Sequence, residues 1–200
     1  MEIKNYETLV NEKAIKAEFI SYVEKLSVLE WKTKRDLIVE RDNNHCLICN
    51  SSGTKTEFGQ ILRERTNEER AIYIQEYNSQ LEDVAKSFNL PITQFTHSEK
   101  KVPYIKAEKA IILHVHHTYY IKDKLPWDYP NESLKTLCQN CHQDLHNKTE
   151  IPVYFDEKME EKIELTKCKR CNGSGFLSQY DYYLNGICLR CNGNQFDELI

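Results

Sequence analysis

The eight cysteines of this 200-residue chain, all of them in Cys-X-X-Cys pairs, constrain its fold most strongly. The four pairs are Cys46/Cys49, Cys138/Cys141, Cys168/Cys171 and Cys188/Cys191. Two such pairs together supply the four thiolates of a tetrahedral structural zinc site. The competing interpretation is a disulfide framework or a set of redox pairs, and a framework requires an oxidising compartment. The sequence therefore predicts two structural zinc ions.

The start of the chain and its composition indicate a reducing compartment. Residues Met1 to Glu7 lack the basic and then apolar order of a secretory signal. No apolar run approaches the roughly 18 residues of a membrane span, so we expect no membrane association. Hydrophobic content of 40% and charged content of 29% are ordinary for a globular protein. We therefore expect a cytoplasmic protein whose thiols stay reduced.

The two C-terminal pairs fit a four-cysteine zinc ribbon, because sixteen residues separate Cys171 from Cys188. Gly173, Gly175 and Gly193 permit the left-handed backbone that such knuckles use. The pattern Cys-X-X-Cys-X-Gly-X-Gly also resembles half of a cysteine-rich zinc repeat of J-domain chaperones, over about 25 residues. That resemblance implies zinc and contact with a macromolecule, so a protein partner could bind through the ribbon.

The other two pairs must share the second zinc ion across 88 intervening residues. Cys141 is followed directly by His142, so the zinc would fix the start of the segment that carries this histidine. We predict a helix over residues 139–147. His142 and His146 are four residues apart and would lie on one face of that helix.

Two predicted strands precede this helix. A β-branched and apolar run predicts a strand over residues 109–116, and a second short strand is expected over 134–137. Alternation along the first strand would put His114 and His116 on one face and His117 on the other. The cysteines already complete two tetrahedral sites, so the histidines are candidates for a separate site. The alternative is that they only pack around, or enlarge, a structural zinc site.

Apolar residues at three- and four-residue spacing predict further helices over residues 11–29, 32–41 and 64–88. A segment rich in Glu and Lys that contains Pro152 indicates a connector before the last cysteines. The expected organisation is an N-terminal helical segment (1–35), a central domain (36–150) with an insertion at about 51–109, a linker (151–166) and a zinc ribbon (167–200).

Three motifs together resemble the HNH endonucleases with a ββα-metal site, in the variant whose ends are joined by a four-cysteine zinc. The motifs are Cys46-X-X-Cys49, Val115-His116-His117 and Leu137-Cys138-X-X-Cys141-His142-X3-His146. The resemblance covers residues 36–150 apart from the insertion. It implies an α+β fold, in which a ββα-metal core carries N-terminal helices and a helical insertion and precedes the small zinc ribbon.

The resemblance also implies a catalytic divalent cation. His116 and His142 stand where the family has metal ligands, and His146 stands where a residue binds the metal or a phosphate oxygen. His114, on the face of His116, is expected to support these ligands. An imidazole-rich set of ligands suits Mn²⁺, Ni²⁺ or Zn²⁺, and Mg²⁺ can bind when phosphate completes the coordination.

The same resemblance gives His117 the position of the general base, which takes a proton from the attacking water. A neutral imidazole with a pKa near 6.5 is suited to that task. The residue at the family's central asparagine position is Ser133, nine residues before His142, and this is a departure from the pattern. Asn131 could take that place if the loop is shifted.

The implied function is metal-dependent hydrolysis of DNA phosphodiester bonds, with duplex DNA as the expected substrate. A net charge of −4 argues against binding to nucleic acid through general electrostatic attraction, although a local patch and a metal ion would suffice. The alternative is a zinc protein without catalytic activity that binds nucleic acid or a protein partner. Ser133 and the net charge favour the alternative, whereas the intact set of histidines favours the nuclease.

Overall fold

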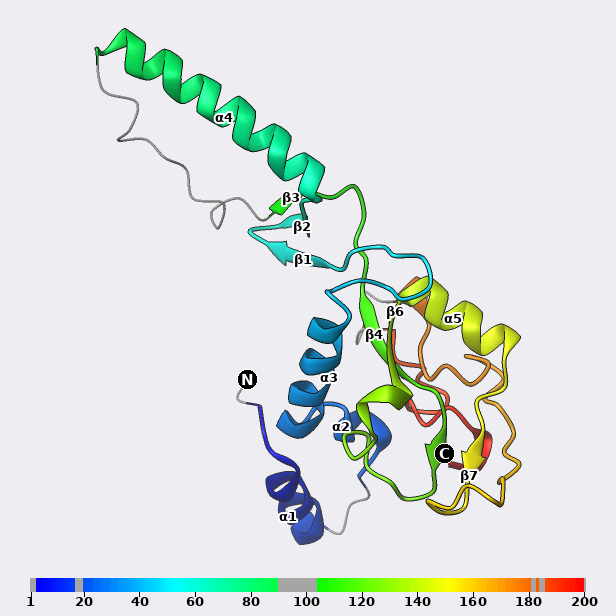
Figure 1. Cartoon of the computed structure of the whole chain (residues 1–200). Coiled ribbons are helices and arrows are strands. Elements are labelled where there is room, and N and C mark those ends of the chain that lie inside the picture. Colours follow the sequence, from blue (N-terminus) through cyan, green and yellow to red (C-terminus); the bar gives the residue numbers. More distant parts are fainter. Residues whose placement is uncertain (1–2, 17–19, 90–103, 181–182, 184–185, 200) are drawn as a thin grey trace. The chain divides into compact units, whose positions relative to one another are not determined.

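The computed structural model describes residues 3–16, 20–89, 104–180, 183 and 186–199. The described chain is a mixture of helices and small sheets, as expected. It forms two compact units, drawn in Figure 1: unit 1 comprises Met1–Ser51 and Ile112–Ile200, and unit 2 comprises Ser52–Ile111. None of the described helices is both long and apolar enough to cross a membrane.

The centre of unit 1 is an antiparallel pair of strands followed directly by a helix. The strands are β4 (Leu113–His117) and β6 (Leu134–Cys138), and the helix is α5 (Gln139–Lys148). All three elements were predicted, and the first strand begins at Leu113 instead of residue 109. Helix α5 starts immediately after the last residue of β6, so no loop separates the strand from the helix.

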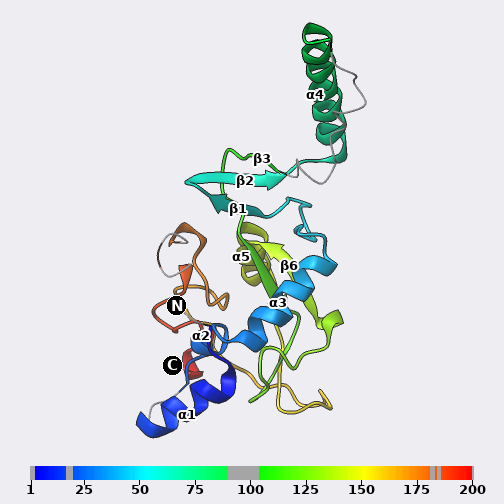
Figure 2. The same cartoon turned by 90° about the vertical axis from the view of Figure 1, so that its left-hand side faces the viewer.

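Helix α3 (Leu29–Arg41) lies beside β4 and β6, as Figure 1 and Figure 2 both show. The helix predicted over residues 32–41 is thereby confirmed. Trp31 and Ile38 are seven residues apart, on one face of the helix, and both are buried. The hydrophobic core of unit 1 comprises Leu9, Val28, Trp31, Ile38, Val115, Tyr129 and Leu134.

The prediction of one helix over residues 11–29 is wrong. Helix α1 covers Tyr6–Lys16, and a short second helix, α2, covers Tyr22–Lys25. Ser21 has extended backbone angles, and its hydroxyl accepts a hydrogen bond from the backbone N–H of Glu24. The Glu24 carboxylate accepts the Ser21 backbone N–H in return. This capping box starts a new helix where the apolar spacing alone suggested a continuous one.

The segment expected to be a plain linker, residues 151–166, contributes a strand. Strand β7 (Val153–Tyr154) pairs in parallel with β5 (Tyr120–Ile121). The Tyr129 hydroxyl accepts the backbone N–H of Ile121 at 2.8 Å, which fixes the loop after β5 to the same sheet.

Unit 2 contains a helix and a sheet. The sheet consists of β1 (Thr54–Glu57), β2 (Gln60–Glu64) and β3 (Tyr104–Lys106) in the order β1-β2-β3, and the helix is α4 (Asn67–Ser87). The helix predicted over residues 64–88 is confirmed, and it starts at a capping box between Thr66 and Glu69. The sheet was not predicted, so the insertion is not purely helical.

The C-terminal segment, residues 167–200, belongs to unit 1. Among its described residues, regular structure is limited to the 3-10 helices Ser178–Tyr180 and Asp197–Leu199 and to single bridges such as Phe176 with Ile187. Its buried cluster consists of the four cysteines and Leu177. So small an apolar core indicates that this segment depends on its cysteines for stability.

Candidate metal centre

Strand β4 and helix α5 bring three histidines together. His116 comes from the strand, and His142 and His146 come from the helix. The potential ligand atoms of the three side chains all lie within 4.8 Å of one another. The rings of His142 and His146 lie 5.4 Å and 5.0 Å from that of His116. We call this group the histidine triad.

A reciprocal pair of hydrogen bonds holds the helix in place against the strand. The Gln139 side-chain carbonyl accepts the backbone N–H of Ile112 at 2.9 Å, and the Gln139 backbone N–H donates to the Ile112 carbonyl at 3.0 Å. Gln139 is the first residue of α5, and Ile112 immediately precedes β4. The two elements that carry the triad are therefore joined at their ends.

Each ring of the triad has one buried nitrogen without a hydrogen-bond partner. These atoms are Nδ1 of His116, Nδ1 of His142 and Nε2 of His146. An unsatisfied buried polar group costs about 1–3 kcal/mol, and a coordinated metal ion would remove this cost at all three atoms. The triad can therefore bind a metal ion, and three protein ligands would leave coordination positions open for water or substrate.

Burial keeps the triad neutral. It lowers the pKa of His116 to about 3 and that of His146 to about 4, and it lowers the pKa of His142 well below the usual 6.5. The charges of neighbouring histidines act in the same direction on His116 and His142. A histidine must be deprotonated to bind a metal, so the rings are in the required state at neutral pH.

The first two cysteine pairs form one cluster, from Cys46, Cys49, Cys138 and Cys141. The knuckle that carries the first pair is bound to β6, because the backbone N–H of Leu47 donates to the Thr136 carbonyl at 2.9 Å. Hydrogen bonding with Ser51 lowers the pKa of Cys49 to about 6, whereas burial and neighbouring sulfurs raise the pKa of Cys141. Four thiolates at this spacing require a cation, and the cluster is compatible with a structural zinc ion.

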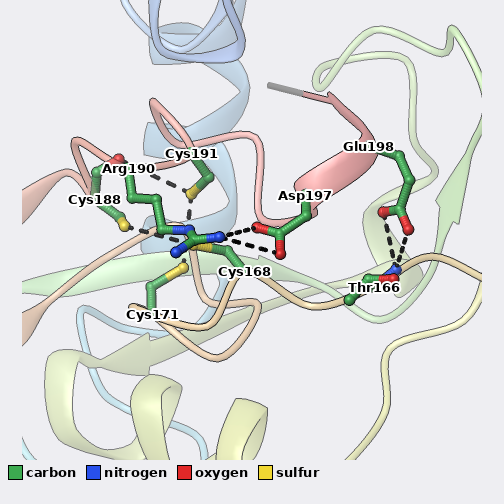
Figure 3. A network of polar contacts seen from close by, with 8 residues as sticks. All are labelled: Thr166, Cys168, Cys171, Cys188, Arg190, Cys191, Asp197 and Glu198. Atoms are coloured by element: carbon green, nitrogen blue, oxygen red, sulfur yellow. Dashed lines mark hydrogen bonds and ion pairs between the residues drawn. The ribbon is translucent and has the colours of Figure 1, made fainter.

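The C-terminal pairs form the second cluster, from Cys168, Cys171, Cys188 and Cys191 (Figure 3). All four cysteines are buried. Gly175 donates its backbone N–H to Cys171 Sγ at 3.3 Å. Its φ is +68°, and a Cβ there would lie 2.7 Å from the Gly193 carbonyl oxygen, so only glycine fits. An ion pair at 3.3 Å joins Arg190, between the last two cysteines, to Asp197 near the end of the same segment. This cluster is also compatible with structural zinc.

His117 lies outside the triad. Its ring stacks on Trp31 at 5.3 Å and meets the edge of Tyr129 at 4.7 Å. Its Nε2 lies 2.9 Å from the Pro126 carbonyl oxygen, and because a carbonyl only accepts, Nε2 carries the hydrogen and Nδ1 holds the free lone pair. Burial lowers the pKa of His117 to about 4, against the opposing effect of that hydrogen bond.

Ser133 is buried at the end of a 3-10 turn, Asn131–Ser133, just before β6. Its hydroxyl donates to the Pro130 carbonyl at 2.8 Å. Its own carbonyl accepts the backbone N–H of Thr118 at 2.9 Å and the Thr118 hydroxyl at 3.0 Å. Ser133 therefore fixes the backbone of the residue that follows His117. The backbone carbonyl of Asn131, the alternative candidate, accepts a hydrogen bond from Arg41 Nη1 at 2.6 Å.

Sequence reasoning missed the residues that surround His117. Trp31 falls between the helices predicted over residues 11–29 and 32–41, and no element was predicted at Pro126. The ring of Tyr120 also lies 5.3 Å from that of His117. Both Pro126 and Tyr120 line a cavity of about 1080 Å³ within unit 1. No local pattern in the sequence marks such contacts, because they join distant segments.

Comparisons of the chain with protein-family models, with curated proteins and with solved structures found no significant match.

Proposed function

We propose that this protein is a metal-dependent endonuclease of the HNH type, which hydrolyses phosphodiester bonds of DNA. The observation that carries the proposal is the histidine triad, with its three unpartnered buried nitrogens on a strand and a helix. A four-cysteine cluster lies at the first turn of the same helix, and His117 follows the triad residue of the strand.

Phosphodiester hydrolysis needs a nucleophilic water, neutralisation of the phosphate charge and a stabilised leaving oxygen. In this proposal His116, His142 and His146 hold one divalent cation, which would supply the charge neutralisation and stabilise the leaving 3′-oxygen. Structural zinc in the first cysteine cluster would fix the start of α5 and thereby the separation of His142 from His116.

His117 would act as the general base through Nδ1. The hydrogen bond from Nε2 to Pro126 and the stack on Trp31 hold the ring in one orientation. The lowered pKa keeps the ring unprotonated at neutral pH, so that Nδ1 can accept the proton of the attacking water. A positioned general base typically contributes about 10²- to 10⁴-fold to the rate.

The charges around the histidines favour a phosphate ligand despite the net charge of −4. Burial is the largest cause of the lowered histidine pKa values, and the positive charges of nearby side chains lower these values further. Lys34 acts on His117, Lys135 on His116, and Lys167 on His146. A local positive field can attract the DNA backbone even when the net charge of the whole chain is negative.

The second candidate is a non-catalytic zinc protein that binds nucleic acid or a protein partner. Ser133 favours it, because the resembled family has asparagine at that position and the serine hydroxyl bonds to Pro130 within its own turn. In this alternative the cysteine clusters maintain the fold, and the histidines bind metal without catalysis.

Incubation of supercoiled plasmid with the protein and Mg²⁺, Mn²⁺, Ni²⁺ or Zn²⁺ tests the proposal. We expect open-circle or linear DNA from the wild type and from Asp144→Ala, which changes an exposed residue of α5. His142→Ala should abolish cleavage, and His117→Ala should slow it at least about 100-fold.

Equal cleavage by all four proteins would reveal a contaminating nuclease and contradict the proposal. Intact plasmid with every protein and every metal would favour the non-catalytic candidate. Nicked and linear products would also distinguish cleavage of one strand from cleavage of both.

A further inference from the structure

His114 connects the histidine triad to the C-terminal segment. It lies two residues before His116 on β4, on the same face of the strand. One side of its ring stacks on His142, with 5.3 Å between centroids and 15° between planes. The ring of Phe176 contacts it at 4.2 Å. His114 thus stands between a triad residue and the zinc ribbon.

Phe176 is itself held firmly by the ribbon. It follows Gly175, which closes the second cysteine cluster, and it forms a bridge with Ile187. A Cβ on Gly186 would lie 2.3 Å from the Phe176 ring, so the absence of a side chain at Gly186 makes room for the ring. The second cluster therefore determines where this ring sits.

The ribbon also holds the helix that carries two triad residues. Gln143 Nε2 donates to the Cys171 carbonyl at 3.2 Å, and the Ser174 hydroxyl donates to Gln143 Oε1 at 3.1 Å. Lys167 Nζ donates to the His146 carbonyl at 3.3 Å, at the C-terminal end of α5, where a cation is favourable. The ribbon thus contacts α5 beside both His142 and His146.

We propose that His114 and Phe176 are positioning residues of the histidine triad, and that the zinc ribbon thereby sets the affinity of the triad for its metal ion. The inference rests on the metal-binding part of the proposed function and goes beyond it, because it assigns a role to the C-terminal cysteine cluster. His114 acts through the packing of its ring, which fixes the orientation of His142. Residues that orient a metal ligand typically contribute about 10- to 100-fold to metal affinity.

The test is a titration of full-length protein, with both cysteine clusters filled with zinc, by Co²⁺. Cobalt bound only by imidazole gives d–d bands without the intense sulfur-to-cobalt charge-transfer bands that exchange into a cysteine cluster would produce. We expect His114→Ala and Phe176→Ala each to weaken Co²⁺ binding about 10-fold or more. His114→Phe should restore nearly wild-type affinity, because it keeps a stacked ring.

Leu177→Ala is the matched control, since Leu177 is buried next to Phe176 and packs with the four cysteines without being a metal ligand. It should leave Co²⁺ affinity unchanged as long as zinc analysis finds two ions in the chain. If Leu177→Ala weakened Co²⁺ binding as much as Phe176→Ala, the effect would come from general destabilisation of the segment, and the inference would be contradicted.

Two other results would overturn the inference. Unchanged Co²⁺ affinity in His114→Ala would remove the positioning role, and His114→Phe as weak as His114→Ala would show that the ring nitrogen is needed instead of the stack. Both results leave the proposed function intact, provided that the wild type binds Co²⁺ and cleaves DNA. Absence of Co²⁺ binding by the wild type would instead defeat the proposed function and the inference together.

Discussion

At the scale of single residues, most of the buried side-chain polar atoms without a hydrogen-bond partner in the described part of the chain are imidazole nitrogens. The unpartnered nitrogens of His116, His142 and His146 are buried within one small volume. Each would cost about 1–3 kcal/mol if nothing were bound to it. One cation satisfies all three, whereas separate water molecules would each need further hydrogen-bond partners. The cost of leaving these atoms unsatisfied is therefore an argument for a metal ion in its own right.

Ser133 is the residue whose role separates the two candidate functions. Its carbonyl bonds to Thr118, while its hydroxyl bonds only within its own turn. We expect Ser133→Ala to lower the free energy of unfolding by about 1 kcal/mol and metal-dependent cleavage by less than about tenfold. Urea unfolding and plasmid cleavage measure the two effects. A loss of cleavage as large as that of His117→Ala would give the hydroxyl a direct part in catalysis.

The histidines also show which site residues the sequence can predict. The spacing of His142 and His146 matches the helical period, so their shared face follows from the sequence alone. The position of His116 close to His142 and His146 depends on the pairing of β4 with β6, in which His116 lies opposite Lys135. The surroundings of His117 depend on contacts with Trp31 that no local pattern encodes.

At the scale of elements, one carboxylate joins α3 to the strand pair. Asp42, the residue after α3, accepts Arg41 Nε at 2.8 Å and the backbone N–H of Thr136 in β6 at 3.0 Å. Burial would raise the pKa of Asp42, but the hydrogen bonds from Arg41 and Thr136 outweigh burial and hold it below its usual 3.8. The native state therefore favours the ionised carboxylate.

The sign of the pH dependence follows from this lowered pKa. Stability from Asp42 is fully present above about pH 4 and is lost as the pH falls through the lowered folded-state value. We expect Asp42→Asn to lower the free energy of unfolding by about 1–2 kcal/mol, equally at pH 7 and pH 5. Urea unfolding at both pH values measures it. A difference that shrinks between pH 7 and pH 5 would mean that the carboxyl is protonated in that range.

Elements of unit 2 and of the N-terminus mark the limit of sequence-based prediction. The stretches Thr54–Glu57 and Gln60–Glu64, which pair as β1 and β2, are both short. The first contains no apolar residue, so the sequence has no alternation of apolar and polar residues there that would predict a strand. Helix α4 is long and carries apolar residues at three- and four-residue spacing, so that spacing predicted it. The break at Ser21 was not predicted, because the apolar spacing that indicated one helix continues across the capping box.

At the scale of the whole molecule, the two cysteine clusters and the triad form one connected arrangement within unit 1. The first cluster lies at the start of α5, and two of the three triad residues lie on α5. The ribbon contacts His114, which stacks on His142, and the carbonyl of His146 through Lys167. The four cysteine pairs and their assignment to two clusters follow from the sequence. The packing of the ribbon against α5 does not, because the Gln143 and Ser174 side chains that make it are ordinary polar residues.

The most direct test of the central claim is anomalous X-ray diffraction from crystals of the wild-type protein grown with Mn²⁺. The account predicts a manganese peak among the ring nitrogens of His116, His142 and His146, and zinc peaks at the two cysteine clusters as internal references. Two zinc peaks with no peak at the triad, in crystals of a protein that cleaves DNA with Mn²⁺ in solution, would contradict the account. The cation that hydrolysis needs would then have to bind elsewhere.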